Sequence, residues 1–333
     1  MPRSSRVERL VKFSKCIGLP HMRVHEKRRT QVRCSGGGSL VFGITVVVPS
    51  YNCADYLAAA LESVVNQTIF DWQLIVIDDG STDNTRAVVS PFLDDARIQY
   101  LYQENRGLPA ARNAGIRETN SEFVAFLDAD DALREDALQV MSLRMRQSSA
   151  SWCLTDILKR RPERDSVERS QIPRSDFMMA ILRDDFIRRG MFFRRSSLVA
   201  VGMYDETMRY REDWDLNIRM FLHGEPFVYV PKPLYLYSWR EGSITTGSRG
   251  RMLNYTEKLL RKHHKRLADA DQPGMRALYS SLMWGLSRNY WYEAKDHAHA
   301  VRCALESLRY DLRPARILHP LQHRWRGWCA ERA

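Results

Sequence analysis

The amino-acid sequence predicts an α/β fold built on a doubly wound, mostly parallel sheet, followed by a helical C-terminal extension. The first observation is that short β-branched or apolar runs alternate with segments of helical periodicity between residues 44 and 146. Such alternation is typical of a parallel sheet with helices on both faces. The second is that carboxylates directly follow two of these runs. Sheets of this class bind their ligands at those strand ends.

Each element of the first half follows from its residue pattern. Ile44–Val48 is a β-branched run that stops at Pro49, which is typical of a buried strand. Residues 55–67 place apolar side chains at helical spacing. Similar apolar runs predict strands at 74–77, 98–102 and 123–127. Helical spacing of apolar residues predicts helices at 82–89, 108–119 and 132–146.

The pattern is looser in the second half. A strand is expected at 152–157, and the highly charged stretch 159–174 is expected to be a loop. Apolar spacing predicts a helix over 213–222, and two prolines interrupt an extended segment over 228–237. From residue 251 to about residue 310 the pattern is that of amphipathic helices.

The formal net charge of +11 is unevenly distributed. Residues 1–40 hold ten basic and two acidic residues, which accounts for +8 and leaves the body nearly balanced. We expect a disordered basic arm, either without function or attracted to an anionic membrane surface. A nucleic-acid-binding protein is disfavoured, because the body lacks a basic stripe with interleaved aromatic residues.

Cysteine usage and hydropathy predict a cytoplasmic protein. The six cysteines are scattered without C-x-x-C spacing, which fits a reducing compartment. The uncharged stretch between Cys34 and Ala54 has an apolar core of only about ten residues, half of what a spanning helix needs. The basic arm and the segment 313–328, with Trp325 and Trp328, predict peripheral attachment to the inner face of the plasma membrane.

Two adjacent carboxylates, Asp78 and Asp79, end the second strand and precede a glycine turn. A carboxylate at a strand end can accept a hydrogen bond from a nucleobase N–H or a ribose hydroxyl. The alternative is that Thr82 or Asp83 caps the following helix. Capping needs only one such residue, so it does not account for the cluster.

Three carboxylates, Asp128, Asp130 and Asp131, lie within four residues after the fourth strand. They repel one another unless a divalent cation neutralises them. Their hard oxygen atoms favour Mg²⁺ or Mn²⁺, which in proteins usually also bind substrate phosphates. The alternative is an acidic helix N-terminus.

A third acidic pair, Glu212 and Asp213, opens the amphipathic helix over 213–222. Asp213 is a candidate general base if it reaches a hydroxyl in a water-poor cleft. Taken alone, it is also a candidate helix cap.

Taken in order, these motifs resemble the family 2 glycosyltransferases over about residues 43–245. The matching segments are Val47–Asn52, Asp78–Ser81, Asn105–Gly107, Ala111–Gly115, Asp128–Asp130 and Glu212–Asp213. The resemblance implies a Rossmann-like GT-A fold and inverting transfer from a nucleoside diphosphate sugar. It also implies an arm over 1–40, a GT-A domain over 41–250 with a nucleotide half (about 41–131) and an acceptor half (about 132–250), and a helical region over 251–333.

The resemblance further implies a role for each matching residue. Pro49, Tyr51 and Asn52 would lie at the nucleotide pocket, and Asp78 or Asp79 would contact the nucleobase. Arg112 would lie near the phosphates, Asp128 would contact the ribose or the metal, and Asp130 would bind the metal. Asp213 would be the general base, with Glu212 and Asp131 as supporting neighbours. Many relatives carry a histidine where this chain has Arg240. Arginine does not ligate metals, but it can hold a phosphate.

The expected protein is therefore a hexosyltransferase-type enzyme that uses Mn²⁺ or Mg²⁺. Its expected donor is a UDP-sugar, and its expected acceptor is a glycan or a lipid-linked molecule, as in cell-surface polysaccharide synthesis. The alternative is an inactive nucleotide-sugar-binding scaffold, which the intact carboxylates disfavour.

Two further motifs are given structural interpretations. His263 and His264 are expected to be exposed polar positions on a helix. The aromatic run Tyr290–Tyr292 is expected to serve helix packing rather than sugar binding.

Overall fold

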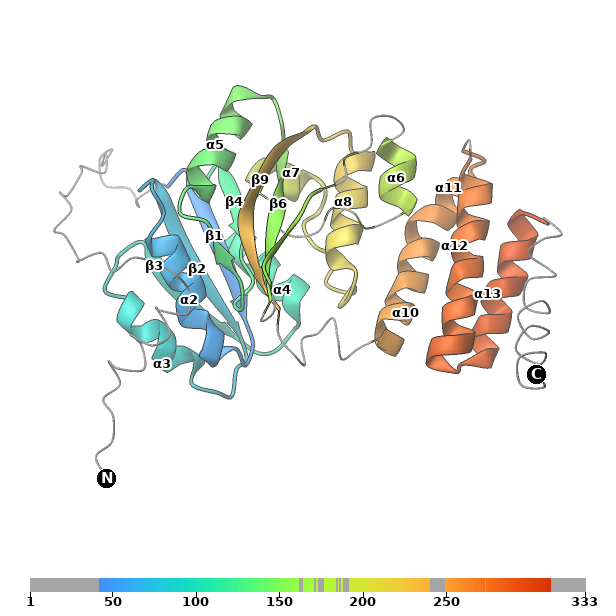
Figure 1. Ribbon diagram of the computed structural model, residues 1–333, viewed down its shortest axis with the longest axis horizontal. Helices are drawn as coiled ribbons and strands as arrows, with labels where there is room; N and C mark the ends of the chain where they lie inside the picture. The colour runs from blue at the N-terminus through green and yellow to red at the C-terminus, as the bar shows by residue number, and fades with distance from the viewer. Residues whose placement is uncertain are drawn as a thin grey trace. The chain divides into compact units, whose positions relative to one another are not determined.

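The computed structural model describes residues 42–161, 164–170, 172, 177–183, 185, 187, 192–239, 249–272 and 274–312 (Figure 1). Its strands are β1 (Ile44–Ser50), β2 (Trp72–Asp79), β3 (Ile98–Gln103), β4 (Phe123–Phe126), β5 (Ala132–Leu133), β6 (Trp152–Arg160), β7 (Ser166–Glu168), β8 (Phe192–Arg194) and β9 (Phe227–Ser238). The helices are α2 (Ala54–Val65), α3 (Thr85–Val89), α4 (Leu108–Arg117), α5 (Ala137–Gln147), α6 (Phe177–Arg183), α7 (Arg195–Ala200), α8 (Glu212–Leu222), α10 (Arg249–Leu259), α11 (Arg266–Asp269), α12 (Met275–Asn289) and α13 (His297–Tyr310). A 3₁₀ turn, η1 (Ser90–Phe92), follows α3, and two π-helical segments, η2 (Leu260–Lys265) and η3 (Tyr290–Ala294), lie in the C-terminal helices.

The strands form one sheet in the order β3-β2-β1-β4-β8-β6-β9-β5, with β7 paired to β6. The first four strands are mutually parallel, and Ser50 at the end of β1 stands opposite Asp78 on β2. This arrangement confirms the predicted doubly wound fold. Beyond β4 the sheet is mixed, because β8 runs antiparallel to both β4 and β6.

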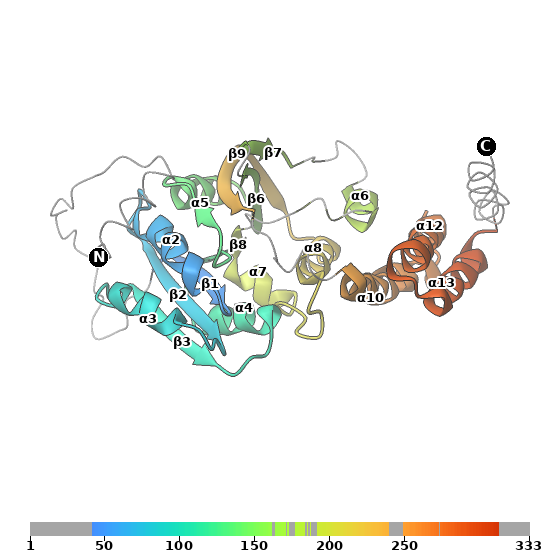
Figure 2. The same cartoon turned by 60° about the horizontal axis from the view of Figure 1, so that its bottom comes forward.

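Helices cover both faces of this sheet, as the views in Figures 1 and 2 show. One apolar core joins α2, α3 and α5 to Val46, Val48 and Val76 on one face. The other core joins α4, α7 and α8 to Val47 and Ile77 on the opposite face. The alternating side chains of β1 therefore enter opposite cores, which explains why the whole strand is apolar.

Close packing of α4 onto β1 depends on Gly115. A Cβ at this position would lie 2.4 Å from Cγ1 of Val47, which is far inside van der Waals contact. The glycine therefore allows α4 to approach the sheet, and Arg112 lies one turn earlier on the same helix.

The C-terminal helices share the second core with the sheet. Leu259, Tyr279 and Met283 belong to the same buried cluster as Leu216 and Ile218 of α8. Among the described residues, no helix is long and apolar enough to span a bilayer.

Two local predictions were wrong. The predicted helix over 132–146 begins only at Ala137, because Ala132 and Leu133 pair with β9 as the short strand β5. The predicted loop over 159–174 includes β7, which pairs with β6.

The arm 1–40, Arg240 and the segment 313–328 lie outside the described residues, and the predicted domain boundaries stay predictions.

Candidate active site at the carboxyl ends of the parallel strands

Hydrogen bonds join the loop after β1 to the loop after β2. Asn52, with a positive φ of 51°, accepts from the backbone N–H of Thr82 at 2.8 Å. Its own N–H donates to Oγ of Ser81 at 3.0 Å. Asp83 accepts from the backbone N–H of Ala54 at 2.9 Å, which satisfies a donor at the start of α2. The two loops are thereby held as one wall beside the strand ends.

Asp78 and Asp79 are buried at the end of β2, and both are hydrogen-bonded within the protein. Asp78 accepts from the backbone N–H of Ser81 and from the Tyr100 hydroxyl. Asp79 accepts from the backbone N–H groups of Arg106 and Gly107, at 2.9 Å and 2.8 Å. The second carboxylate therefore fixes the shape of the loop that leads into α4.

The residues at the end of β1 differ in exposure. Pro49 is buried opposite Ile77, and Tyr51 is 50% exposed. Between them, the Ser50 hydroxyl is buried and has no hydrogen-bond partner in the part of the chain that the structure describes. Buried hydroxyls are usually paired, so this oxygen is an exception at the end of β1.

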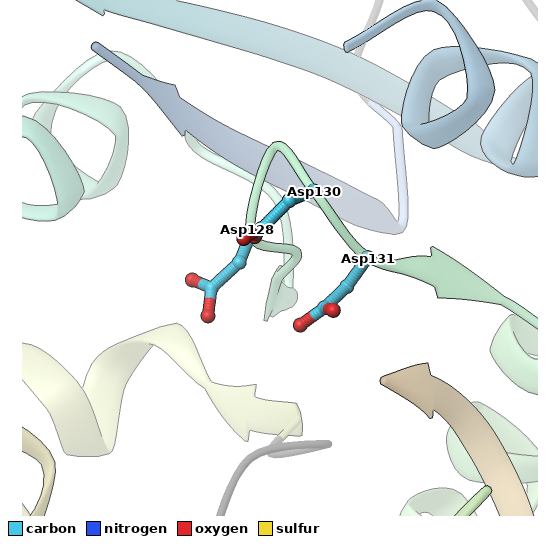
Figure 3. A group of neighbouring side chains, drawn as sticks. All are labelled: Asp128, Asp130 and Asp131. Carbon is cyan, nitrogen blue, oxygen red and sulfur yellow. The ribbon is translucent and has the colours of Figure 1, made fainter. Parts of the chain in front are cut away.

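The acidic turn after β4 brings carboxylate oxygens of Asp128, Asp130 and Asp131 within 4.8 Å of one another (Figure 3). Asp131 is buried and accepts from the Tyr235 hydroxyl at 2.8 Å and from the backbone N–H of Ser238 at 2.9 Å. The short strand β5 follows the turn directly and pairs with β9, the strand that carries Tyr235. Three close carboxylates of this kind fit a hard divalent cation.

Arg112 joins this turn to the start of α8. One guanidinium nitrogen donates to Glu212 at 3.1 Å and to Asp213 at 2.9 Å. The other donates to Asp128 at 3.1 Å. The guanidinium carbon also lies 5.2 Å from the ring centroid of Tyr204, within cation–π range. One buried cation thus holds three carboxylates from two distant parts of the chain.

Burial and neighbouring charge separate the properties of the two acids on α8. Glu212 is buried, and burial together with the nearby Asp213 charge raises its pKa to about 8, although Arg112 acts in the opposite direction. The side chain of Asp213 is 24% exposed. The pKa of Arg112 is raised above its ordinary value, because attraction to Asp213, Asp128 and Glu212 outweighs the effect of burial.

A second buried charge cluster supports α8 from the side of the C-terminal helices. Asp215 is fully buried, and its Oδ1 lies 2.6 Å from Nζ of Lys262 and 2.8 Å from Nε2 of His263. Its Oδ2 accepts from Nε of Arg219 at 2.8 Å. These hydrogen bonds and charges outweigh burial and lower the pKa of Asp215 well below its ordinary value.

Sequence reasoning did not identify this cluster. His263 and His264 were expected to be exposed, and both are buried, so that prediction was wrong. His264 donates to the backbone carbonyl of Leu182, and burial lowers its pKa to about 4. The signal in the sequence was the position of Asp215 on the apolar face of α8, where an acid needs a buried partner.

Of the residues singled out from the sequence, the structure brings Arg112, Asp128, Glu212 and Asp213 into direct contact. Asp130 and Asp131 lie in the same turn as Asp128. Asn52, Asp78 and Asp79 lie at the ends of the neighbouring strands, where they hold loops together. Arg240 lies outside the described residues.

A family model described as "Glycosyl transferase family 2" matches residues 45–205. A Campylobacter jejuni protein named GalNAc(5)-diNAcBac-PP-undecaprenol beta-1,3-glucosyltransferase is 28% identical over 296 residues, which cover 83% of this chain and 91% of the relative. Glycosyltransferase GlyA of Streptococcus pneumoniae is 28% identical over 61% of this chain, but the chain spans only 31% of the length of GlyA.

Solved structures share the fold. Residues 1–349 of TarS from S. aureus, in complex with UDP-GlcNAc, superpose with a TM-score of 0.65 at 18% identity, covering 86% of this chain and 88% of that one. The mannosyltransferase PcManGT from Pyrobaculum calidifontis, in complex with GDP-Man and Mn²⁺, gives a TM-score of 0.53 at 16% identity, covering 80% and 87%.

Proposed function

This chain belongs to glycosyltransferase family 2, and from that premise we propose that it is a metal-dependent, inverting enzyme. It would move a sugar from a nucleoside diphosphate sugar to a hydroxyl of a glycan or lipid-linked acceptor. The strongest support is the set of contacts made by Arg112, which join the acidic turn after β4 to the start of α8. Asp128, proposed to lie on the side of the sugar donor, and Asp213, proposed to lie on the side of the acceptor, thereby belong to one site.

Asp213 is the general base in this proposal. Burial and the neighbouring Asp213 charge raise the pKa of Glu212 to about 8, which disfavours the carboxylate form that a general base needs. Asp213 is partly exposed, and an acceptor hydroxyl can reach it. Its contacts with Arg112 and with the Tyr204 hydroxyl, at 2.9 Å and 3.3 Å, both involve Oδ1, which leaves Oδ2 to take the proton.

Asp130 is the proposed ligand of a divalent cation, supported by its neighbours in the turn. Asp128 is oriented by Arg112, and Asp131 is held by Tyr235 and Ser238. When bound, Mn²⁺ or Mg²⁺ would stabilise the negative charge that develops on the leaving diphosphate. Clustered oxygen donors suit either ion.

The donor is proposed to bind across the loops after β1 and β2, beside Tyr51, Asn52 and Asp78. The complexes of TarS with UDP and UDP-GlcNAc favour a UDP-sugar. The Campylobacter relative is named for an undecaprenol-linked acceptor, which favours a lipid-linked acceptor here.

The chemical step follows from these positions. Asp213 takes the proton of the acceptor hydroxyl while that oxygen attacks the anomeric carbon on the side opposite the leaving group. The bond from the anomeric carbon to the diphosphate oxygen breaks, and the nucleoside diphosphate leaves with the bonding electrons. A single displacement of this kind inverts the anomeric centre, and Arg112 keeps the base oriented throughout.

The experiment that tests this proposal measures release of UDP from UDP-sugars, together with UDP affinity, in the presence of Mn²⁺. We expect turnover that stops in excess chelator and returns with Mn²⁺ or Mg²⁺. Asp213→Asn should lower the rate by about 10²–10⁴-fold, because it cannot accept the proton, while UDP affinity changes little. Asp94→Asn, which alters an exposed carboxylate between α3 and β3, is the control.

Two outcomes would contradict the proposal. Full turnover in excess chelator would show that the reaction needs no metal. An Asp213→Asn variant as fast as the unmutated enzyme would show that Asp213 is not the general base. UDP-sugar binding without any turnover would instead support the inactive scaffold.

A further inference from the structure

The helical pair α12 and α13 presents a second apolar surface, to which α13, η3 and the adjoining edge of α12 all contribute. The buried side of α13 packs on α12 through Cys303 and Ser307, and Ser280 of α12 hydrogen-bonds to Ser307 at 2.9 Å. On the opposite side, Val301 is 49% and Leu305 57% exposed. Figures 1 and 2 show the two helices side by side. Among the residues that the structure describes, α13 therefore has a second, half-exposed apolar side besides the one that packs on α12.

The π-helical segment η3 extends this surface with aromatic rings. Tyr290 is buried, and its hydroxyl donates to Asn254 at 2.7 Å. The next two residues, Trp291 and Tyr292, are 43% and 50% exposed, so the expectation that the whole run serves helix packing holds only for its first member. A π-turn changes the direction of successive side chains, and such turns are frequent at functional sites.

A cavity of about 210 Å³ opens within this surface. Its lining residues are Trp284, Ser287, Arg288, Trp291, Tyr292, Ala300, Val301 and Ala304. Most of them are apolar, so the cavity suits a hydrocarbon group better than a sugar.

Every charged residue exposed on α12 or α13 is basic in the part of the chain that the structure describes: Arg276, Arg288, Arg302 and Arg309. The acid of α13, Glu306, is buried and accepts from the Tyr279 hydroxyl. On η3 and the turn after it, exposed Glu293 is balanced by exposed Lys295, and the partly exposed Asp296 lies 2.7 Å from His299. The exposed charges of α12 and α13 themselves are therefore all positive.

We propose that α12, η3 and α13 form a docking face for an anionic lipid bilayer. Exposed tryptophan and tyrosine beside aliphatic side chains suit the boundary between headgroups and acyl chains. The arginines suit acidic headgroups. This face consists of described residues, so it is independent of the basic arm and of residues 313–328.

Charge disfavours the two occupants that this chain itself supplies. A second copy of the face would bring arginines against arginines. Residues 313–333 contain five arginines and one glutamate, so they carry the same sign as the face they would cover. An anionic surface is complementary to the face, whereas both of these are repelled by it.

Flotation of the full chain with vesicles tests the proposal. We expect the protein to float with phosphatidylglycerol-containing vesicles at low salt, and less with phosphatidylcholine alone. Trp291→Ser with Tyr292→Ser should reduce the bound fraction strongly. Arg288→Gln with Arg302→Gln should weaken binding by about fivefold per arginine and flatten its salt dependence.

The control is Phe70→Ser with Leu143→Ser, which removes two side chains of similar exposure, 56% and 52%, from the helices and loops around the sheet. UDP-sugar turnover should be unchanged in all three double variants, which separates this test from that of the proposed function. The proposal is overturned if the full chain stays at the bottom of the gradient. It is also overturned if the aromatic variant floats as the control does, since another part of the chain would then bind the vesicles.

Discussion

At the scale of single residues, the site depends on one buried arginine that holds more acids than it neutralises. Arg112 contacts Asp128, Glu212 and Asp213, so two negative charges would remain if all three acids were ionised. Burial makes that excess costly, and the system responds by keeping a proton on the most buried acid, Glu212.

This arrangement predicts a specific dependence of stability on pH. The pKa of Glu212 is raised from 4.5 to about 8 by burial and by Asp213. Between these values the folded state holds a proton that the unfolded state has lost. The free energy of unfolding should therefore fall as pH rises through this window, with a contribution of at most about 1.4 kcal/mol per pH unit.

Glu212→Gln removes this titration. In urea unfolding measured from pH 5 to pH 8, the variant should lose less stability with rising pH than the unmutated protein. Glu293→Gln, at an exposed position on η3, is the control and should keep the original slope. Parallel slopes for the unmutated protein and Glu212→Gln would mean that Glu212 is ionised in the folded state.

At the scale of elements, α8 is held between the sheet and the C-terminal helices. Asp213 in its first turn contacts Arg112 of α4. Asp215, two residues later, contacts Lys262 and His263 of the π-helical segment η2. Lys262 also bonds to Asp205 at 2.7 Å, in the loop that precedes α8. The segment η2 thereby fixes both the helix that carries the proposed base and the loop before it.

Lys262→Met tests this support. The change leaves Asp215 buried with less compensation and should lower the free energy of unfolding by about 2 kcal/mol. The rate of sugar transfer should fall more than the affinity for UDP, because Lys262 contacts the helix that carries Asp213, whereas the donor is proposed to bind at the loops after β1 and β2. Chemical denaturation and initial rates measure the two effects.

Lys265→Met is the matched control, because Lys265 lies on the same segment and pairs with exposed Asp269. An exposed pair of this kind contributes little, so we expect a change within about 0.5 kcal/mol and an unchanged rate. Equal effects of the two substitutions would show that Asp215 does not depend on Lys262.

At the scale of the whole molecule, the sheet and the C-terminal helices share one core. Leu216 and Ile218 of α8 belong to the same buried cluster as Leu260, Met275 and Tyr279 of the C-terminal helices. A chain that ends at residue 248 would expose this cluster to water, at a cost of roughly 25 cal/mol per Å² of apolar surface.

We therefore expect the chain ending at residue 248 to aggregate or to lose cooperative unfolding. A chain ending at residue 312 keeps all of these contacts and should unfold cooperatively. Urea unfolding followed by tryptophan fluorescence distinguishes them. Cooperative unfolding of the shorter chain would instead establish residues 41–248 as an independent domain.

The sequence by itself determined the parallel half of the sheet and the acidic turn after β4. Ile44–Val48 and the runs like it predict buried strands, because a β-branched run bounded by turn residues has few other favourable conformations. Asp128, Asp130 and Asp131 are neighbours in the chain, so their proximity in space needed no tertiary information.

Only the tertiary structure decided which charges compensate one another. Arg112 and Glu212 are 100 residues apart, and Asp215 and His263 are 48 apart. Local periodicity shows that a side chain is polar or apolar, but it does not show what a buried polar group meets. The same reason explains β5 and β7, since each is a strand because of its partner rather than its own residues. The physical cause is that burial removes water, and the choice of replacement partner is made by the packing of distant segments.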